Sequence, residues 1–269
     1  MPVIIATLIL ANTILWHTIF LHQHIAPFVS FLDIGQGNSV LIANNASALL
    51  YDAGPSGLQT TQKISERLPF YRKTIDLIFL SHPDTDHYQG AFEVLKRYHV
   101  QALLVSPYTS QESGWVQLLQ KAKQQGTAII IVDARDTIAT PSENILVLSP
   151  PPHAQTTLKT DNERSLVLSI AQKELSATTT FLLTGDIGAK TEKILTEAYT
   201  LKSDYLLVPH HGSKYSSSEI FLQSVAPRKA IVQVGKNKYG HPHQDTLLRL
   251  KKFSIPLWRT DINGTLKVE

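Results

Sequence analysis

The sequence predicts an α/β fold, and two observations lead to that class. Short apolar runs typical of buried strands alternate with amphipathic helical patterns through most of the chain. Several of these runs end in short loops that carry His or Asp, which is where α/β folds place their chemistry. The 269 residues and the 43% hydrophobic content are enough for a substantial core.

Composition excludes some functions and leaves others open. The chain has no cysteine, so it has no disulfide, thiolate metal site or cysteine nucleophile. The net charge of +3 is mild, and the basic residues are scattered along the chain. Composition alone therefore gives little support for nucleic-acid binding.

The N-terminal segment, residues 1–27, is predicted to be a single-pass membrane anchor. The run from Val3 to Leu21 is uncharged and, at 1.5 Å per residue, comes close to spanning a bilayer core. A cleaved signal peptide is the competing interpretation, although the segment lacks a basic start and a clear cleavage site. A buried core helix is the third, although the run lacks a polar face. Because no basic residue lies near either end, the sequence does not specify an orientation.

Residue 28 begins a different pattern, and we expect 28–269 to form one compact domain. A meander of three short strands comes first, at 28–32, 39–42 and 48–51, with turns rich in Gly and Asn. Further strands are predicted at 74–80, 102–105, 128–132, 145–148, 166–170, 181–183, 205–208 and 230–234. Helices are predicted at 61–68, 88–98, 115–123, 190–198, 217–224 and 245–252.

The strand at 74–80 is followed by four potential metal ligands within six residues. These are His82, Asp84, Asp86 and His87, in the order His-x-Asp-x-Asp-His. A single loop Asp is usually a turn former or a helix cap. Capping alone explains four such side chains poorly, so we interpret the cluster as a metal site.

Three later loops carry further candidate side chains at strand ends. Asp186 follows a strand within Gly-Asp, the pair His210-His211 follows the next strand, and His241 lies in Gly-His-Pro after a third. Each feature alone has an ordinary structural explanation. Together with the first cluster, they predict convergence on one edge of a layered fold.

The His-x-Asp-x-Asp-His spacing resembles the signature of the metallo-β-lactamase-fold hydrolases, in which His-x-His-x-Asp-His is the commoner form. Asp84 stands where the second His often stands, and a carboxylate there makes manganese or magnesium as plausible as zinc. Across 28–269 the chain is similar to the C-terminal extracytoplasmic domain of the DNA-uptake channel protein ComEC. The motifs that carry this similarity are 33–38, 82–87, 162–168, 185–186, 210–214, 240–242 and 259–264. The many-helix channel part of that family has no counterpart here, which indicates a stand-alone relative or a fragment.

This resemblance implies an αββα sandwich, preceded here by the N-terminal hydrophobic helix. It also implies a hydrolase with two divalent cations, zinc or manganese being favoured. Its expected substrate is the phosphodiester backbone of DNA, cleaved outside the cytoplasm during uptake or processing. The implied partners are DNA, the membrane through residues 1–27, and a DNA-uptake channel protein.

The resemblance also assigns roles to individual side chains. One cation is expected at Asp86 and His87 with one His of the 210/211 pair, where we favour His211. The other is expected at His82 and Asp84, with Asp186 bridging the two. The resemblance assigns catalytic roles to His241, His210 and Asp86. It assigns substrate phosphate binding to Ser213, Lys214 and Asn38. It assigns support of the metal-binding loop to Asp52 and Asn162.

Two departures from the family pattern keep other functions open. Asn38 replaces the Asp of the usual Gly-Gln-Gly-Asp turn, and Asn162 stands where many relatives have a further His. A non-catalytic nucleic-acid-binding module is therefore one alternative. A metal-dependent hydrolase of a small ester, such as a phosphocholine ester or a lactone, is the other, because it would use the same ligands.

Overall fold

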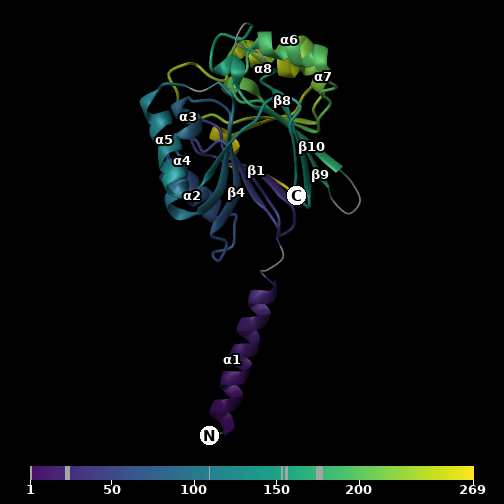
Figure 1. The fold of residues 1–269 in the computed structure, drawn as a ribbon. Coiled ribbons are helices and arrows are strands. Elements are labelled where there is room, and N and C mark those ends of the chain that lie inside the picture. Colours follow the sequence, from purple (N-terminus) through teal and green to yellow (C-terminus); the bar gives the residue numbers. More distant parts are fainter. Residues whose placement is uncertain (1, 22–24, 109, 153, 155–156, 174–177) are drawn as a thin grey trace.

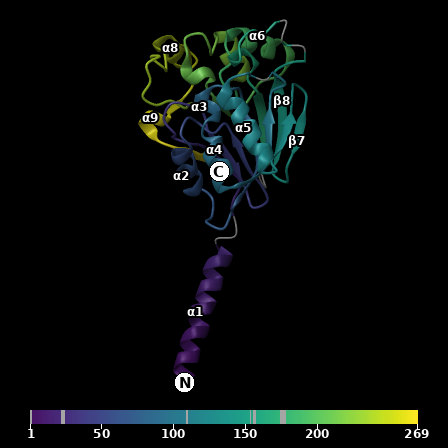
Figure 2. The same cartoon turned by 60° about the vertical axis from the view of Figure 1, so that its left-hand side comes forward.

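The computed structural model describes residues 2–21, 25–108, 110–152, 154, 157–173 and 178–269. Two seven-stranded sheets pack face to face, and helices cover their outer faces (Figures 1 and 2). Three separate clusters of buried side chains correspond to the three interfaces between these four layers. The expectation of an α/β fold with an αββα sandwich is confirmed.

The first sheet has the strand order β14-β1-β2-β3-β4-β5-β6. Its antiparallel half ends at β3, and β3 to β6 run parallel to one another. The bounds are β1 (Phe28–Phe31), β2 (Val40–Ala43), β3 (Ala48–Tyr51), β4 (Thr74–Leu80), β5 (His99–Val105), β6 (Ala128–Ile131) and β14 (Leu266–Val268).

The second sheet, ordered β13-β12-β11-β10-β9-β8-β7, repeats this pattern. Its antiparallel half ends at β10, from which β11 to β13 continue parallel. The bounds are β7 (Thr137–Ala139), β8 (Glu143–Ser149), β9 (Val167–Lys173), β10 (Thr178–Leu183), β11 (Tyr205–Leu207), β12 (Lys229–Val232) and β13 (Leu257–Arg259). The two sheets are thus topological repeats, which the sequence itself does not reveal.

The helices divide between the two outer faces. The first face is covered by α2 (Gly57–Ser65), α4 (Ala91–Arg97) and α5 (Ser113–Gln124), and the second by α6 (Ala189–Ala198), α7 (Glu219–Val225) and α8 (Gln244–Lys252). Single-turn elements at loops are α3 (Thr85–Tyr88), α9 (Thr260–Asn263), η2 (Asn162–Arg164) and η3 (Pro209–Gly212).

Most strands and helices were predicted, and the differences have local causes. The helix expected at 88–98 is two helices, α3 and α4, separated at Gly90, where a Cβ atom would lie 1.8 Å from the Ala53 carbonyl oxygen. Three strands were missed, namely β7, β13 and β14, and each has only three residues. Strand β14 returns from the C-terminus to pair with β1, a contact that no local pattern indicates.

Helix α1 (Pro2–Leu21) extends away from the sandwich (Figure 1). Its side chains from residue 2 to residue 18 are exposed, so the interpretation as a buried core helix was wrong. Over the described residues, no helix combines the length and the apolar character needed to cross a membrane, so the predicted span is not supported. Residues 1 and 22–24 of the expected anchor lie outside the described residues.

The contact between the sheets gives a test of the core. Phe181 of β10 is fully buried, stacks on Tyr205 at 5.1 Å between ring centroids, and lies 6.4 Å from the Phe31 ring of the opposite sheet. Phe181→Ala should lower the free energy of unfolding by about 3–5 kcal/mol in urea denaturation, because it leaves a cavity between the sheets. Phe70 is 82% exposed, so Phe70→Ala should change it by no more than about 0.5 kcal/mol. Equal effects of the two changes would contradict this account of the core.

Candidate metal centre

The predicted cluster after β4 lies at the carboxyl end of that strand. Ser81 and His82 follow the last strand residue and are buried, and Asp84 is the residue that precedes α3. Helix α3 carries Asp86 and His87, and the His87 side chain is fully buried. One strand and a single helical turn therefore position all four predicted ligands.

Asp52 organises this loop from the end of β3. Its carboxylate accepts hydrogen bonds from the Ser81 backbone N–H at 2.7 Å, from the Ser81 hydroxyl at 2.8 Å and from His87 Nδ1 at 2.8 Å. Because the Ser81 hydroxyl donates its only hydrogen to Asp52, it accepts from His82 Nδ1, which lies 2.9 Å away. Both imidazoles thus carry a proton on Nδ1, which leaves the lone pair of each Nε2 free.

Asp186 approaches from the second sheet, directly after β10. Gly185 before it has φ of +52°, and a Cβ atom there would lie 3.0 Å from the Cβ atoms of Ser165 and Ser81. The Asp186 backbone N–H donates to the Ser165 hydroxyl at 3.3 Å. A glycine is needed at this point because it lets the two sheets approach closely and turns the carboxylate towards His87.

His210 and His211 lie in η3, directly after β11, and both have left-handed backbones with φ of +52°. His211 is buried, and its Nδ1 donates to the Gln233 carbonyl at 2.9 Å. Its Nε2 therefore faces two carboxylates, at 3.3 Å from Asp86 Oδ2 and 3.5 Å from Asp186 Oδ2. His210 is more open, and its Nε2 lies 3.7 Å from Asp186 Oδ2.

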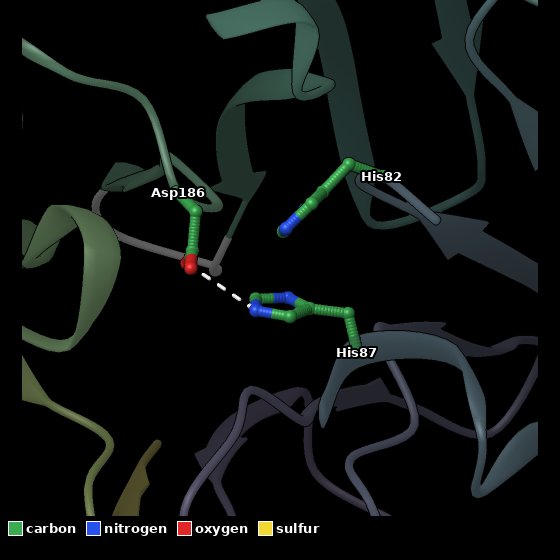
Figure 3. A group of neighbouring side chains, drawn as sticks. All are labelled: His82, His87 and Asp186. Atoms are coloured by element: carbon green, nitrogen blue, oxygen red, sulfur yellow. Dashed lines mark ion pairs between the residues drawn. The ribbon is translucent and has the colours of Figure 1, made fainter. Parts of the chain in front are cut away.

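These side chains form two overlapping groups with the spacing of metal ligands. One group is His82, His87 and Asp186, and the other is Asp86, His87 and His211. Figure 3 shows the first group, with His82 and His87 pointing towards the Asp186 carboxylate. Oδ1 of Asp186 lies 3.3 Å from His87 Nε2, whereas its Oδ2 faces the 210/211 pair.

The chemistry of this donor set fits divalent cations. Nε2 of His82, His87 and His211 and Oδ1 of Asp186 are buried and have no hydrogen-bond partner among the described residues. Buried polar atoms in proteins are nearly always paired, so four such atoms pointing at one another indicate a site that could hold a cation. Three imidazoles with carboxylates are ligands that zinc and manganese accept.

The electrostatics of the centre also favour bound positive charge. Burial raises the pKa of Asp186, but His211 and His87 outweigh it and hold that pKa well below its usual range. Burial likewise lowers the pKa of His87, but Asp186 and Asp52 outweigh it and raise the pKa well above its usual range. In the absence of metal, protons on the imidazoles thus supply the positive charge that the carboxylates attract.

A cavity of about 170 Å³ opens onto this centre. Its lining residues are Gln36, Asp84, Asp86, Asp186, His210, His211, Tyr239 and His241. The ring of His241 lies 5.4 Å from that of His210, and its buried Nδ1 has no partner among the described residues. Burial and the neighbouring histidines lower the pKa of His241 to about 4, so its imidazole is neutral at pH 7.

The other predicted site residues lie at varying distances from this cavity. Asp84 is at the rim, with Oδ2 3.4 Å from His82 Nε2, and falls in neither ligand group. Asn38 is buried, its backbone N–H donates to the Asp86 carbonyl, and its side-chain amide has no partner among the described residues. Asn162, Ser213 and Lys214 do not line the cavity.

Several residues of the site had no motif to reveal them. Ser81 and Ser165 act through hydrogen bonds to the ligand loops, and Gln233 acts through its backbone carbonyl. Gln36 and Tyr239 line the cavity from two loops far apart in the chain. Gln36 lies inside the quoted 33–38 turn, and Tyr239 directly precedes the Gly-His-Pro motif, so proximity to motifs was the only sequence indication.

Comparison with known families identifies this arrangement. Residues 32–236 match the Metallo-beta-lactamase superfamily, a range that includes every residue of the two ligand groups. The chain belongs to that superfamily. The resemblance read from the His-x-Asp-x-Asp-His motif is therefore confirmed, as is the expectation of metal-binding hydrolase chemistry at the level of the superfamily.

Curated relatives include Competence protein ComA of Neisseria gonorrhoeae, which is 29% identical over 243 residues that cover 89% of this chain and 32% of the relative. ComE operon protein 3 of Bacillus subtilis (strain 168) is 33% identical over 260 residues, which cover 89% of this chain and 32% of the relative. Recombination protein 2 of Haemophilus influenzae is 32% identical over 248 residues, which cover 89% of this chain and 28% of the relative. The chain thus spans about a third of the length of these relatives.

Solved structures support the fold. The metallo-beta-lactamase fold protein YhfI from Bacillus subtilis aligns with 91% of this chain and 100% of its own, with a TM-score of 0.58 and 12% sequence identity. At that identity the likeness establishes the αββα architecture and not the substrate.

The hydrogen bonds of Asp52 give a test of how the ligands are positioned. Asp52→Asn would place an amide against Nδ1 of His87 and disturb the tautomer that leaves Nε2 free. We expect metal affinity to fall by about 10- to 100-fold in a competition titration with a chelating dye. Asp76→Asn is the matched control, because Asp76 lies at the start of β4 and pairs with Arg72 at 2.9 Å. Equal metal affinity in wild type and Asp52→Asn would contradict the positioning role.

Proposed function

We propose that residues 28–269 form a metal-dependent phosphodiesterase that cleaves nucleic acid. The observation that carries the proposal is the Asp186 carboxylate, which presents one oxygen to His87 and the other to His211. A carboxylate shared in this way is what a two-cation hydrolytic centre requires, since cations about 4 Å apart clamp the attacking and leaving oxygens of a phosphodiester.

Two divalent cations are assigned to the centre, with zinc or manganese preferred. Asp86, His87 and His211 would hold one, and His82 would hold the other with Asp84 at the rim. Asp186 would contact both. When bound, such cations lower the pKa of a water molecule from about 16 towards 7 and neutralise charge on the phosphate.

The chain's own residues around the cations would orient the substrate. His210 and His241 line the cavity, so they would donate hydrogen bonds to phosphate oxygens. Because the pKa of His241 is lowered to about 4, its imidazole would be neutral at pH 7 and would act as a hydrogen-bond donor to a phosphate oxygen; the loss of one such donor commonly slows a reaction by about 10²- to 10³-fold. Asp52 would act indirectly, because it holds His87 and touches no substrate.

The size of the cavity supports a polymeric substrate. Pockets that enclose small-molecule ligands usually measure about 300–1,000 Å³, whereas this one is about 170 Å³. It holds a phosphate group and leaves the rest of the molecule outside, as cleavage of a long strand requires. The similarity to Competence protein ComA supports DNA as that strand, and we propose DNA uptake outside the cytoplasm as the setting and a channel protein as partner.

The same assays test two alternative functions. A hydrolase of small esters would cleave phosphocholine esters or lactones in preference to oligonucleotides. A non-catalytic binding module, suggested by Asn38 and Asn162, would hold little metal after dialysis. An activity panel on DNA and small esters, with elemental analysis of the same preparation, distinguishes all three.

Metal content tests the bridging role of Asp186. Asp186→Asn removes a ligand from both cations, whereas His82→Ala removes a ligand from one, so Asp186→Asn should lose more metal. Elemental analysis after dialysis against metal-free buffer measures this directly. Full and equal occupancy in wild type and Asp186→Asn would overturn the bridging assignment.

His241 and His243 form a matched pair that separates catalysis from structure. His243 precedes α8, and its Nδ1 accepts the Asp245 backbone N–H at 3.2 Å, whereas His241 lines the cavity. His241→Ala should keep its metals and slow phosphodiester cleavage by about 100-fold. His243→Ala should keep its cleavage rate and lose about 1 kcal/mol of unfolding free energy, because it removes a helix cap. A metal-loaded His241→Ala protein with undiminished cleavage would remove His241 from the mechanism.

A further inference from the structure

A second hollow adjoins the metal cavity and has no role in holding metal. It measures about 460 Å³ and is lined by Gln36, Lys236, Asn237, Lys238 and Tyr239. Gln36 and Tyr239 line both hollows, so the two share a wall. We call this second hollow the lysine groove.

The loop that forms the lysine groove is preorganised by Asn237. The side-chain amide of Asn237 donates to the carbonyls of Gly235 and His241, both at 2.9 Å. Its Oδ1 accepts the backbone N–H groups of Tyr239 at 3.0 Å and His241 at 3.1 Å. One side chain therefore ties the groove to the cavity residue His241, which fixes the position of Tyr239 beside the metal centre.

The opposite wall is packed just as closely. A Cβ atom at Gly235 would lie 2.5 Å from the Gly35 carbonyl carbon, so the loop after β12 and the turn after β1 are in direct backbone contact. Gln36 sits at this contact and faces both hollows. The groove therefore keeps its shape without a bound ligand, which lowers the entropy lost on binding.

The side chains of the groove suit a nucleotide. Tyr239 is 62% exposed, which is unusual for a ring beside a buried centre, and its ring lies 5.8 Å from that of His241. Lys236 and Lys238 are exposed, and neither joins an ion pair among the described residues. The Lys238 ammonium lies over the Tyr239 ring, 5.7 Å from its centroid, so a base that stacks on this ring would displace that side chain towards the backbone phosphate. An exposed aromatic ring beside ammonium groups is how proteins bind single strands, with bases stacked on the ring and phosphates on the lysines.

We propose that the lysine groove binds the nucleotide next to the scissile phosphate, with its base stacked on Tyr239 and a flanking phosphate held by Lys236 and Lys238. This inference rests on the proposed phosphodiesterase function and adds a strand preference to it. In a duplex both faces of each base are covered by neighbouring bases. The groove therefore selects single-stranded or frayed nucleic acid over intact duplex.

Binding without cleavage tests the groove directly. The full chain is titrated into a fluorescent single-stranded 12-mer of thymidine in EDTA, and anisotropy is measured. Tyr239→Ala should weaken binding by about 5-fold or more, the lower end for a lost base–aromatic stack, and Tyr239→Phe should retain wild-type affinity. Phe70→Ala, which removes an exposed ring beyond the opposite end of β4, is the control and should change nothing.

A 12-mer of abasic sites separates stacking from phosphate contacts. Tyr239→Ala should bind it as wild type does, because no base is present to stack. Lys236→Ala and Lys238→Ala should weaken binding of both 12-mers and reduce the dependence of affinity on salt. Lys123→Ala, at the exposed end of α5, is the control for lost charge. Nucleotide binding by the lysine groove would be contradicted if Tyr239→Ala bound the thymidine strand with wild-type affinity. It would also be contradicted if wild type showed no measurable binding of that strand.

A cleavage assay tests the lysine groove and the proposed phosphodiesterase function separately. With manganese added, wild type and Lys236→Ala, whose side chain lines the groove and not the metal cavity, are compared on methyl p-nitrophenyl phosphate, a small diester without a base or a flanking phosphate. Cleavage of this diester at equal rates, with a loss confined to the single strand, supports both proposals. Failure of wild type to cleave any diester would overturn the phosphodiesterase alone, since the binding measurements in EDTA do not depend on it. Faster cleavage of a duplex than of its separated strands would overturn the strand preference.

Discussion

The buried Asp186 carboxylate, enclosed by imidazole nitrogens, is the interaction on which the rest of the site depends. A carboxylate that is only a few per cent exposed is costly to ionise unless positive charge compensates it. That charge comes from His87 on the first sheet and His211 on the second. The centre therefore exists only while the two sheets are held face to face. The inter-sheet core around Phe31 and Phe181 is thus part of the site, although neither ring approaches it.

Backbone strain gathers at the same place. Asp52, His210 and His211 all have positive φ, a conformation that costs about 1–3 kcal/mol for a residue with a side chain. Each is held there by tertiary contacts, such as the three hydrogen bonds that the Asp52 carboxylate accepts. Glycine at these positions would relieve the strain but would remove the functional group. Positive φ also occurs at Arg135, Ser217, Ala226 and Ser254, but at the centre it coincides with three side chains that bind or support the ligand groups.

The sequence predicted an α/β fold and most of the centre because both leave local patterns, whereas the αββα sandwich was implied by the resemblance to a known family. Apolar runs mark strands, and strand-end His and Asp mark the edge where parallel strands of each sheet finish. The sequence favoured His211 over His210 but offered no physical reason, because the Gln233 carbonyl that orients His211 reaches its Nδ1 only through the tertiary fold. The sequence also could not predict strand β14, because β14 pairs with β1 from the opposite end of the chain. The membrane anchor expected at 1–27 is not supported. Helix α1 is exposed, but among the described residues no helix is both long and apolar enough to cross a membrane.

The repeated topology of the two sheets explains why the proposed substrate recognition would fall to the loop after β12. In the first sheet, parallel pairing begins with β3 and β4, and the loops after these strands carry Asp52 and the His82–His87 cluster. In the second sheet, parallel pairing begins with β10 and β11, and the loops after these strands carry Asp186 and η3. Those four loops are occupied by ligands and their supports. The cavity of about 170 Å³ among them is smaller than the pockets that usually enclose a whole small-molecule ligand. Selection between substrates must therefore act outside the cavity, and the loop tied together by Asn237 is packed against its rim. A superfamily that shares one centre can in this way serve many substrates, because the loops around the rim vary while the ligands stay.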